Sequence, residues 1–136
     1  MKVKISGAIL ALTNYMHGIL AGDIDKLLNE WADPFSAKKN QMIILPGRVI
    51  TEGDATAIIH TVIIASIIAP SAKKIAETQI VIMEKIYNAF LFGEEIGSPV
   101  LSVKNITGEF FEPTPGTPNV GLIQIDADLV TDYLLD

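Results

Sequence analysis

The first forty residues carry a helical pattern of apolar positions that is interrupted once. Ser6 is a candidate cap for a helix whose apolar residues recur every three or four positions: Ile5, Ile9, Leu12, Met16 and Ile19. Gly22 breaks this helix, and Asp23 is placed to cap a short second helix. The apolar face of that second helix would hold Leu27, Leu28 and Trp31. Pro34 ends it, because the residue before a proline avoids the α conformation, and residues 33–40 then form a polar loop.

The middle of the chain alternates between strand-forming residues and turn signals. Residues 41–45 and 48–50 are predicted to form two short strands joined by a turn at positions 46–47, and positions 52–54 end the second strand. The run at 58–68 is too apolar for periodicity to separate helix from strand. Its β-branched residues favour a buried strand.

The clearest helix in the sequence begins after Pro70-Ser71. Its apolar stripe and the two residues that widen it follow helical spacing: Ile75, Ile82, Ile86 and Phe90, with Met83 and Tyr87. Gly93 is placed to stop it.

Beyond this helix the hydrophobic period returns to two, which predicts two closing strands around a loop. Leu101 and Val103 share one face of the first strand, which ends at Phe110 and Phe111. Three prolines make the next segment an expected exposed loop: Pro113, Thr114, Pro115, Gly116, Thr117 and Pro118. The last strand alternates between an apolar face and a polar face: Ile123, Ile125, Ala127 and Leu129 against Gln124, Asp126 and Asp128.

These elements predict a single α+β domain that spans residues 1–136. Its mostly antiparallel sheet would be packed by the amino-terminal helix and the long helix, in the order α(α)-β-β-β-α-β-β. A length of 136 residues suits one domain, and a hydrophobic content of 49% with 19% charged residues supplies a core and argues against disorder. The 21 isoleucines favour strands.

Charge is unevenly distributed and narrows the classes of partner. Residues 1–68 hold six acids and six bases, whereas residues 69–136 hold ten acids and four lysines. Nucleic-acid affinity depends on clustered Lys and Arg, and the chain has one arginine, Arg48, so sequence-specific nucleic-acid binding is not expected. The acidic half could face a basic partner, repel a polyanion, or form a solvated surface.

Targeting signals are weak. The basic start of the chain is followed by an apolar stretch that Asn14, His17 and Asp23 interrupt early, so no signal peptide is predicted. The apolar run at 55–69 is shorter than the roughly 20 residues that a membrane-spanning helix needs, and no membrane contact is expected.

The sequence holds no recognisable catalytic constellation. The absence of cysteine excludes disulfides, Cys-type zinc sites and thiol nucleophiles. Of the two histidines, His17 suits a helix end, and His60 is either a hydrogen-bonded core residue or the polar residue of a strand face. Asp126 and Asp128 share a strand face, as two metal ligands would, but one strand supplies only part of a calcium shell. A solvated face is the simpler interpretation, and neither an enzyme activity nor a cofactor is expected.

From about residue 41 onward the chain resembles the tail terminator (tail-completion) proteins of long-tailed bacteriophages and prophages. Those proteins typically run from an amino-terminal helix through strands to a long helix lying against the sheet, and then to two closing strands. The corresponding segments here are residues 56–68, 72–92, 100–112 with the loop that follows, and 120–133. The ending GLIQIDADLVTDYLL is typical of them in its alternation and in its tyrosine. The isoleucine-heavy strand and the near absence of arginine depart from their pattern.

The resemblance implies a structural role in virion assembly. Such proteins form a ring, usually of six subunits, that caps the finished tail tube and offers a surface to the head connector. The implied partners are further copies of this chain, tail-tube proteins and head-connector proteins. The implied location is the host cytoplasm during assembly and then the tail or neck of the virion.

The resemblance also suggests roles for particular residues. A negative channel lining does not grip passing DNA, so Asp126 and Asp128 are candidate channel-facing residues. The loop at 113–118 and the loop at 33–40 are candidate contacts with neighbouring subunits or tail proteins.

Three other classes of function stay open from the sequence. One is a small ligand-binding or enzymatic α+β domain, with a pocket between the long helix and the sheet near His60. The second is a dimerising domain of a bacterial complex, and the third is another phage neck or head-completion protein.

Overall fold

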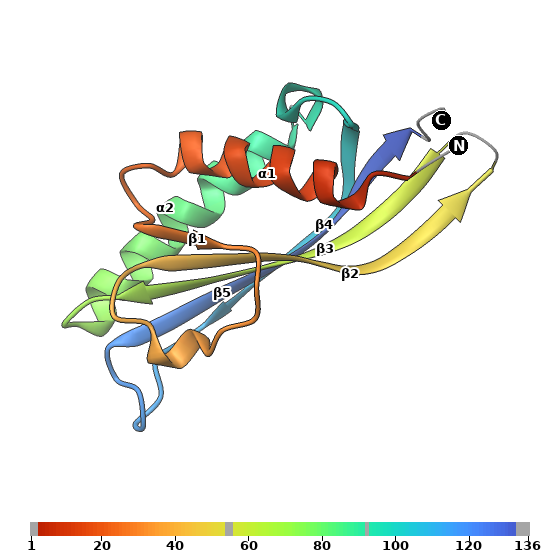
Figure 1. Cartoon of the computed structure of the whole chain (residues 1–136). Helices are drawn as coiled ribbons and strands as arrows, with labels where there is room; N and C mark the ends of the chain where they lie inside the picture. Colours follow the sequence, from red (N-terminus) through yellow and green to blue (C-terminus); the bar gives the residue numbers. More distant parts are fainter. Residues whose placement is uncertain (1–2, 54–55, 92, 133–136) are drawn as a thin grey trace.

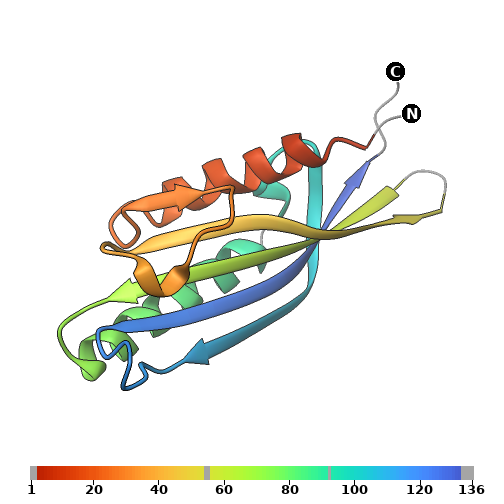
Figure 2. The same cartoon turned by 60° about the horizontal axis from the view of Figure 1, so that its bottom comes forward.

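The computed structural model describes residues 3–53, 56–91 and 93–132, and all five strands of this part join one sheet. The strands are β1 (Lys26–Leu28), β2 (Gln41–Glu52), β3 (Thr56–Ile68), β4 (Val100–Phe111) and β5 (Val120–Asp132). The helices are α1 (Ile5–Ile19), α2 (Ala72–Leu91) and the 3₁₀ helices η1 (Pro34–Ser36) and η2 (Gly93–Ile96). Figures 1 and 2 show a single twisted sheet with both α-helices on the same side.

The α+β fold class predicted from the sequence is confirmed. The sheet order is β1-β2-β3-β5-β4, and every neighbouring pair is antiparallel except β1 with β2. Figure 2 looks onto the sheet and shows this order from β1 at the top to β4 at the bottom. β1 and β4 are therefore the two opposite edges of the sheet.

The core lies between the sheet and the two helices. The predicted alternation of β5 holds, since Ile123, Ile125 and Leu129 are fully buried on the helix-covered face. The stripe of α2 meets them, and its residues Ile75, Ile82, Ile86 and Phe90 are all buried. Burial of each apolar side chain of this kind stabilises the folded state by about 1.5–3 kcal/mol, so this packing holds α2 against the sheet. The opposite face carries no α-helix and is called here the helix-free face.

α2 lies very close to the strand that it crosses. A Cβ added to Gly121 would lie 2.3 Å from Cγ2 of Ile75, a distance at which one of the two must move. Beside it, the buried Gln79 donates from Nε2 to the carbonyl oxygens of Phe111 (3.0 Å) and Leu122 (2.8 Å). This amide joins the helix to the end of β4 and the start of β5.

The short second helix predicted after Asp23 is wrong. Residues 26–28 form β1, which pairs in parallel with β2 at Lys26–Gln41, Leu27–Met42 and Leu28–Ile43. The amide of Asp25 also donates to the carbonyl of Asn40 at 2.9 Å. Backbone pairing to a neighbouring strand outweighs the weak helix propensity of a three-residue apolar cluster, and sequence spacing does not show that neighbour.

The two short strands predicted around Pro46 and Gly47 are a single strand, β2. The chain bulges there, because Pro46 pairs with Thr61 and Arg48 with His60, which leaves Gly47 as an extra residue. β1 ends before this point, so β2 has become an edge where a proline costs no ladder hydrogen bond. The turn signal therefore marks a bulge.

The observed ends of the helices agree only in part with those predicted from the sequence. α2 begins after Pro70-Ser71 as predicted, and the hydroxyl of Ser71 accepts from the amide of Lys74 at 3.2 Å. Ser6 does not cap α1, which begins at Ile5 after Lys4 and has no side-chain cap. The predicted loop at 33–40 contains η1, capped by Asp33. Phe92 and Tyr133, expected near the ends of the long helix and the last strand, lie outside the described residues.

No helix within the described residues is long and apolar enough to cross a membrane.

The substitution Gly121→Ala should destabilise the fold by about 1–3 kcal/mol, because the added methyl group overpacks the contact with Ile75. Gly18→Ala is the matched control, since Gly18 lies in α1 with nothing within 4 Å of an added Cβ. An alanine there should leave stability unchanged or raise it by up to about 1 kcal/mol. Urea unfolding of both variants checks this, and equal effects would contradict the close approach of α2.

Candidate functional site

A cluster of titratable side chains lies on the helix-free face, across the centre of the sheet. His60 on β3 is positioned between two aspartates of β5. Its Nδ1 lies 3.0 Å from Oδ1 of Asp128, and its Nε2 lies 3.4 Å from Oδ1 of Asp126. Because a carboxylate only accepts, the imidazole donates to Asp128 from Nδ1. Protonation of His60 would let it form an ion pair with both carboxylates.

A bulge in β4 adds an amide to this cluster. Lys104 pairs with Asp128 and Thr107 with Asp126, so β4 holds one more residue than β5 between these pairs. Asn105 occupies the bulge with φ of 53°, a left-handed conformation that asparagine tolerates better than most residues. Its Nδ2 donates to Oδ2 of Asp128 at 2.9 Å. Both oxygens of Asp128 are thus engaged.

The region around the cluster carries less net negative charge than its two aspartates alone would give. Arg48 pairs with His60 across β2 and β3, and Lys104 on β4 lies 3.5 Å from Glu52 on β2. Partial burial of Asp128 acts to raise the pKa of its carboxyl. The hydrogen bonds from Asn105 and His60, with the charges of His60 and Lys104, outweigh burial and hold that pKa below its ordinary value of 3.8.

The structure brings Asp126 and Asp128 to one face, as the alternation predicted. Their side chains are 32% and 18% exposed, and both face His60. Gln124 donates to the second oxygen of Asp126 at 3.3 Å. These contacts order the two carboxylates, and whether their face lines a channel stays a prediction.

The predicted location of a pocket, between the long helix and the sheet near His60, is wrong because His60 and the helix lie on opposite faces of the sheet. His60 pairs with Asp128 on the helix-free face, whereas α2 packs on the opposite face. The alternation of a β-strand decides this, because neighbouring residues point to opposite faces.

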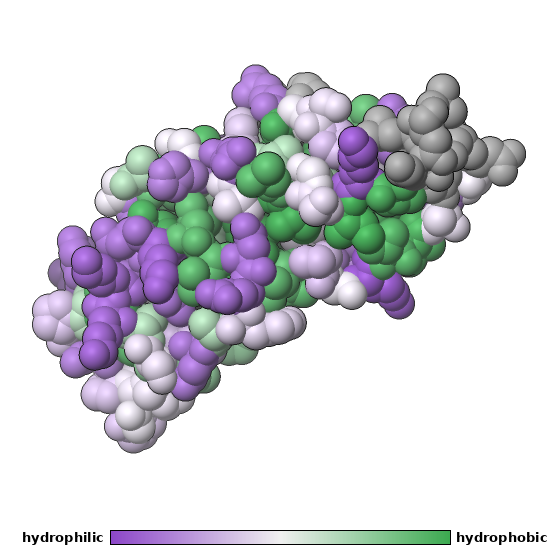
Figure 3. All heavy atoms as spheres, viewed as in Figure 1, coloured by the Kyte–Doolittle hydropathy of each residue, from purple (hydrophilic) through white to green (hydrophobic). Residues whose placement is uncertain are grey.

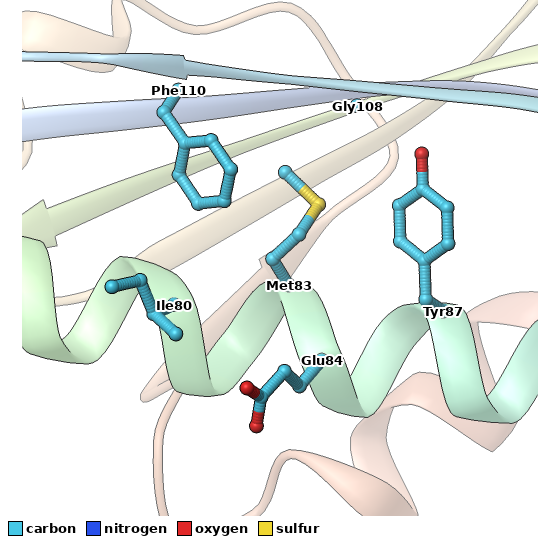
Figure 4. Close-up of a pocket in the computed structure, with 6 residues that line it drawn as sticks. All are labelled: Ile80, Met83, Glu84, Tyr87, Gly108 and Phe110. Carbon is cyan, nitrogen blue, oxygen red and sulfur yellow. The ribbon is translucent and has the colours of Figure 1, made fainter.

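A groove does lie beside α2, at the β4 edge. Figure 4 shows Met83 and Tyr87 of α2 pointing toward the strand and Phe110 pointing from the strand toward the helix, while Ile80 lies along the helix and Glu84 points away. The hollow measures about 400 Å³ and is largely apolar. Gly108 forms part of its wall, where an added Cβ would lie 2.8 Å from Sδ of Met83. Ile80 and Phe110 are each about half exposed.

The proline-rich loop connects β4 to β5 and is mostly exposed, as predicted. A bridge between Thr114 and Thr117 closes it into a tight turn, with their hydroxyl oxygens 3.0 Å apart. Figure 1 places this loop at the lower left, at the end of the sheet opposite the β2–β3 hairpin.

The segment at 33–40 crosses the helix-free face and then reaches the β1 edge. Ser66 of β3 donates to the carbonyl of Pro34 at 2.7 Å, which holds η1 against the sheet. A hollow of about 320 Å³ follows, lined by Lys26, Ser36, Ala37, Lys38, Lys39 and Gln41. Three lysines therefore gather on an otherwise acidic protein.

No group of three or more His, Asp or Glu side chains is arranged to hold a metal ion within the described ranges. His17 lies exposed in the last turn of α1, where the sequence placed it. The sequence analysis did not identify Asn105 and Gln79 as contributors to the site and the core. Their hydrogen bonds depend on which strands lie beside them, and no motif encodes that pairing.

Comparison with known proteins leaves the family open: no protein-family model and no curated protein matches this chain.

The substitution Asp128→Asn should reduce the acid sensitivity of folding. A folded-state pKa below the ordinary value means that the ionised carboxyl contributes stability above about pH 4, which is lost as the pH falls through the folded-state pKa. Urea midpoints of the unmodified protein should therefore drop more steeply between about pH 5 and pH 3 than those of the variant. Asp25→Asn, at an exposed aspartate, is the control for the same chemical change. Parallel curves for the unmodified protein and Asp128→Asn would contradict the pKa shift.

Proposed function

We propose that this protein is a structural component of a long-tailed bacteriophage or prophage particle. In this proposal, copies of the chain form a ring, of about six subunits, that caps the tail tube and joins it to the head connector. The observation that carries the proposal is the layered arrangement of the elements. An amino-terminal helix precedes the first strands, the long α2 lies against the sheet, and the two strands β4 and β5 close the chain. The resemblance to tail terminator proteins implies this same order.

The shape of the sheet supports a ring. β1 and β4 are opposite edges, and the outer side of each pairs with no other described strand. A contact between one edge of a subunit and the opposite edge of the next is heterologous, and such contacts close a ring when the rotation per subunit divides a full turn. Strands running roughly along the ring axis would place the proline-rich loop at one rim and the β2–β3 hairpin at the other.

In such a ring the two faces of the sheet would point in opposite radial directions. The helices would lie outside, and the helix-free face, with Asp126, Asp128 and His60, would face the channel. The loop at 113–118 would project along the axis, toward the tail tube or the head connector, because it lies beyond the ends of β4 and β5.

Light scattering of the purified protein, followed by electron microscopy, is the first test of the ring. A mass of about six subunits and closed rings with a central opening are expected. Rings that form only on addition of tail tubes from the same virion, at one end of each tube, would agree equally. A tight dimer that never associates with tubes would overturn the proposal. Binding to connectors but not to tubes would indicate the related class of head-completion proteins.

Reversing the charge of Asp126 and Asp128 tests the channel wall. With Asp126→Lys and Asp128→Lys, the inner surface becomes positive and should retain DNA, so infectivity should fall while rings still assemble. Asp126→Asn with Asp128→Asn is the control, because it removes the charges but keeps side chains of similar size. Unchanged DNA passage and infectivity in the reversed variant would remove these two residues from the channel.

A further inference from the structure

A hollow at the β1 edge and the end of β4 carry unpaired charges of opposite sign. At the β1 edge, Lys26, Lys38 and Lys39 line a hollow with no acid among its lining residues. At the β4 edge, Glu84 is among the residues that line the groove beside α2, and Glu109 and Glu112 lie at the end of β4. None of these six side chains forms an ion pair with another described residue. Figure 3 looks toward the β1 side, where hydrophilic residues gather at the left.

The two edges also differ in apolar shape. Trp31, in the segment that follows β1, is 73% exposed, the largest exposed fraction among the exposed hydrophobic side chains. The β4 edge offers the opposite form, the apolar hollow between α2 and Phe110. Tryptophan is enriched among the residues that dominate binding energy when they fill such hollows.

These features lie at the same level of the sheet. One row of paired residues runs from Lys26 through Gln41, Ser66 and Leu122 to Phe111. A second row joins Ile44, Ile63, Ile125 and Gly108.

The segment that carries Trp31 is held to these two rows on either side of the tryptophan. Asn29 donates to the carbonyl of Ile44 at 3.0 Å, and the carbonyl of Pro34 accepts from Ser66 at 2.7 Å. The groove between Gly108 and Phe110 occupies the same rows on the opposite edge. Cyclic symmetry has no translation along its axis, so two surfaces that meet around a ring must lie at one height. The two edges satisfy this condition if the strands follow the axis.

We propose that the β1 edge docks on the β4 edge of a second copy of this chain. Trp31 enters the groove formed by Ile80, Met83 and Phe110 of the next subunit, and the three lysines face its Glu109 and Glu112. β1 and the next copy's β4 then run antiparallel, since β1 is parallel to β2 and β4 is antiparallel to it. This inference deepens the proposed ring and rests on it.

A charge exchange between the two edges tests the contact. Lys38→Glu with Lys39→Glu makes the first variant, and Glu109→Lys with Glu112→Lys makes the second. Each alone sets like charges against one another, so the concentration needed for assembly should rise about tenfold or more. An equimolar mixture should assemble again, because each altered edge then meets its complement in an alternating ring. Lys4→Glu and Asp132→Lys, exposed at the other end of the sheet, are the controls and should not change assembly.

Engineered cysteines provide a readout that detects weak association, because the chain has no native cysteine. A variant with both Lys39→Cys and Glu112→Cys should form, on mild oxidation, a ladder of linked oligomers in a denaturing gel. Each single variant should give little product. Dimers from Lys39→Cys alone would indicate a symmetric contact and overturn the proposal, as would the absence of a ladder from the double variant.

Trp31→Ala should weaken assembly by about tenfold or more, whereas Leu91→Ala, at a residue with a similar exposed fraction of 72%, should not.

The outcomes separate this contact from the proposed function. Rings that form normally with every charge variant and give no ladder would refute the contact and leave the cap proposal standing. A ladder from a protein that grows into open filaments, and never binds tail tubes, would support the contact and refute the cap.

Discussion

The close approach of α2 to the sheet is the constraint on which the arrangement depends. Gly121 leaves the space that Ile75 fills, and Gln79 satisfies two strand-end carbonyls at the same place. With the helix fixed there, its apolar stripe covers β5 and β4, and α1 covers the remaining part of the same face. All α-helical packing is thereby committed to one side. The helix-free face and both sheet edges are left to other uses.

The helix-free face shows how a strand can hold charged groups without large cost. Asp126 and Asp128 lie on a face that is partly open to solvent, and His60 and Asn105 supply donors to them. The bulge in β4 makes this possible, because it turns the asparagine amide toward Asp128. Buried polar groups need such partners, so a regular β4 would leave one carboxylate oxygen dependent on water alone.

The two edges of the sheet are chemically unlike, and this difference gives the subunit a direction. A self-complementary contact would need the same surface on both copies, whereas here an edge with a lysine-lined hollow and an exposed tryptophan lies opposite an edge with an apolar groove and two glutamates at the end of β4. Charges of opposite sign steer encounter and disfavour the wrong pairing. Such a subunit is suited to head-to-tail assembly, the kind of contact from which rings are built.

The sequence alone was enough to predict the α+β class, the apolar stripe of α2 and the two faces of β5, because these depend on local periodicity that burial on one side imposes. It also identified Asp126 and Asp128 as neighbours on one face. Three features followed only from the folded arrangement: residues 26–28 form a strand, Pro46 lies in a bulge and His60 faces away from α2. Each of these depends on which strand lies alongside, a long-range pairing that local spacing does not encode. The matching of Lys26 with the level of Phe111, at opposite edges, is of the same kind.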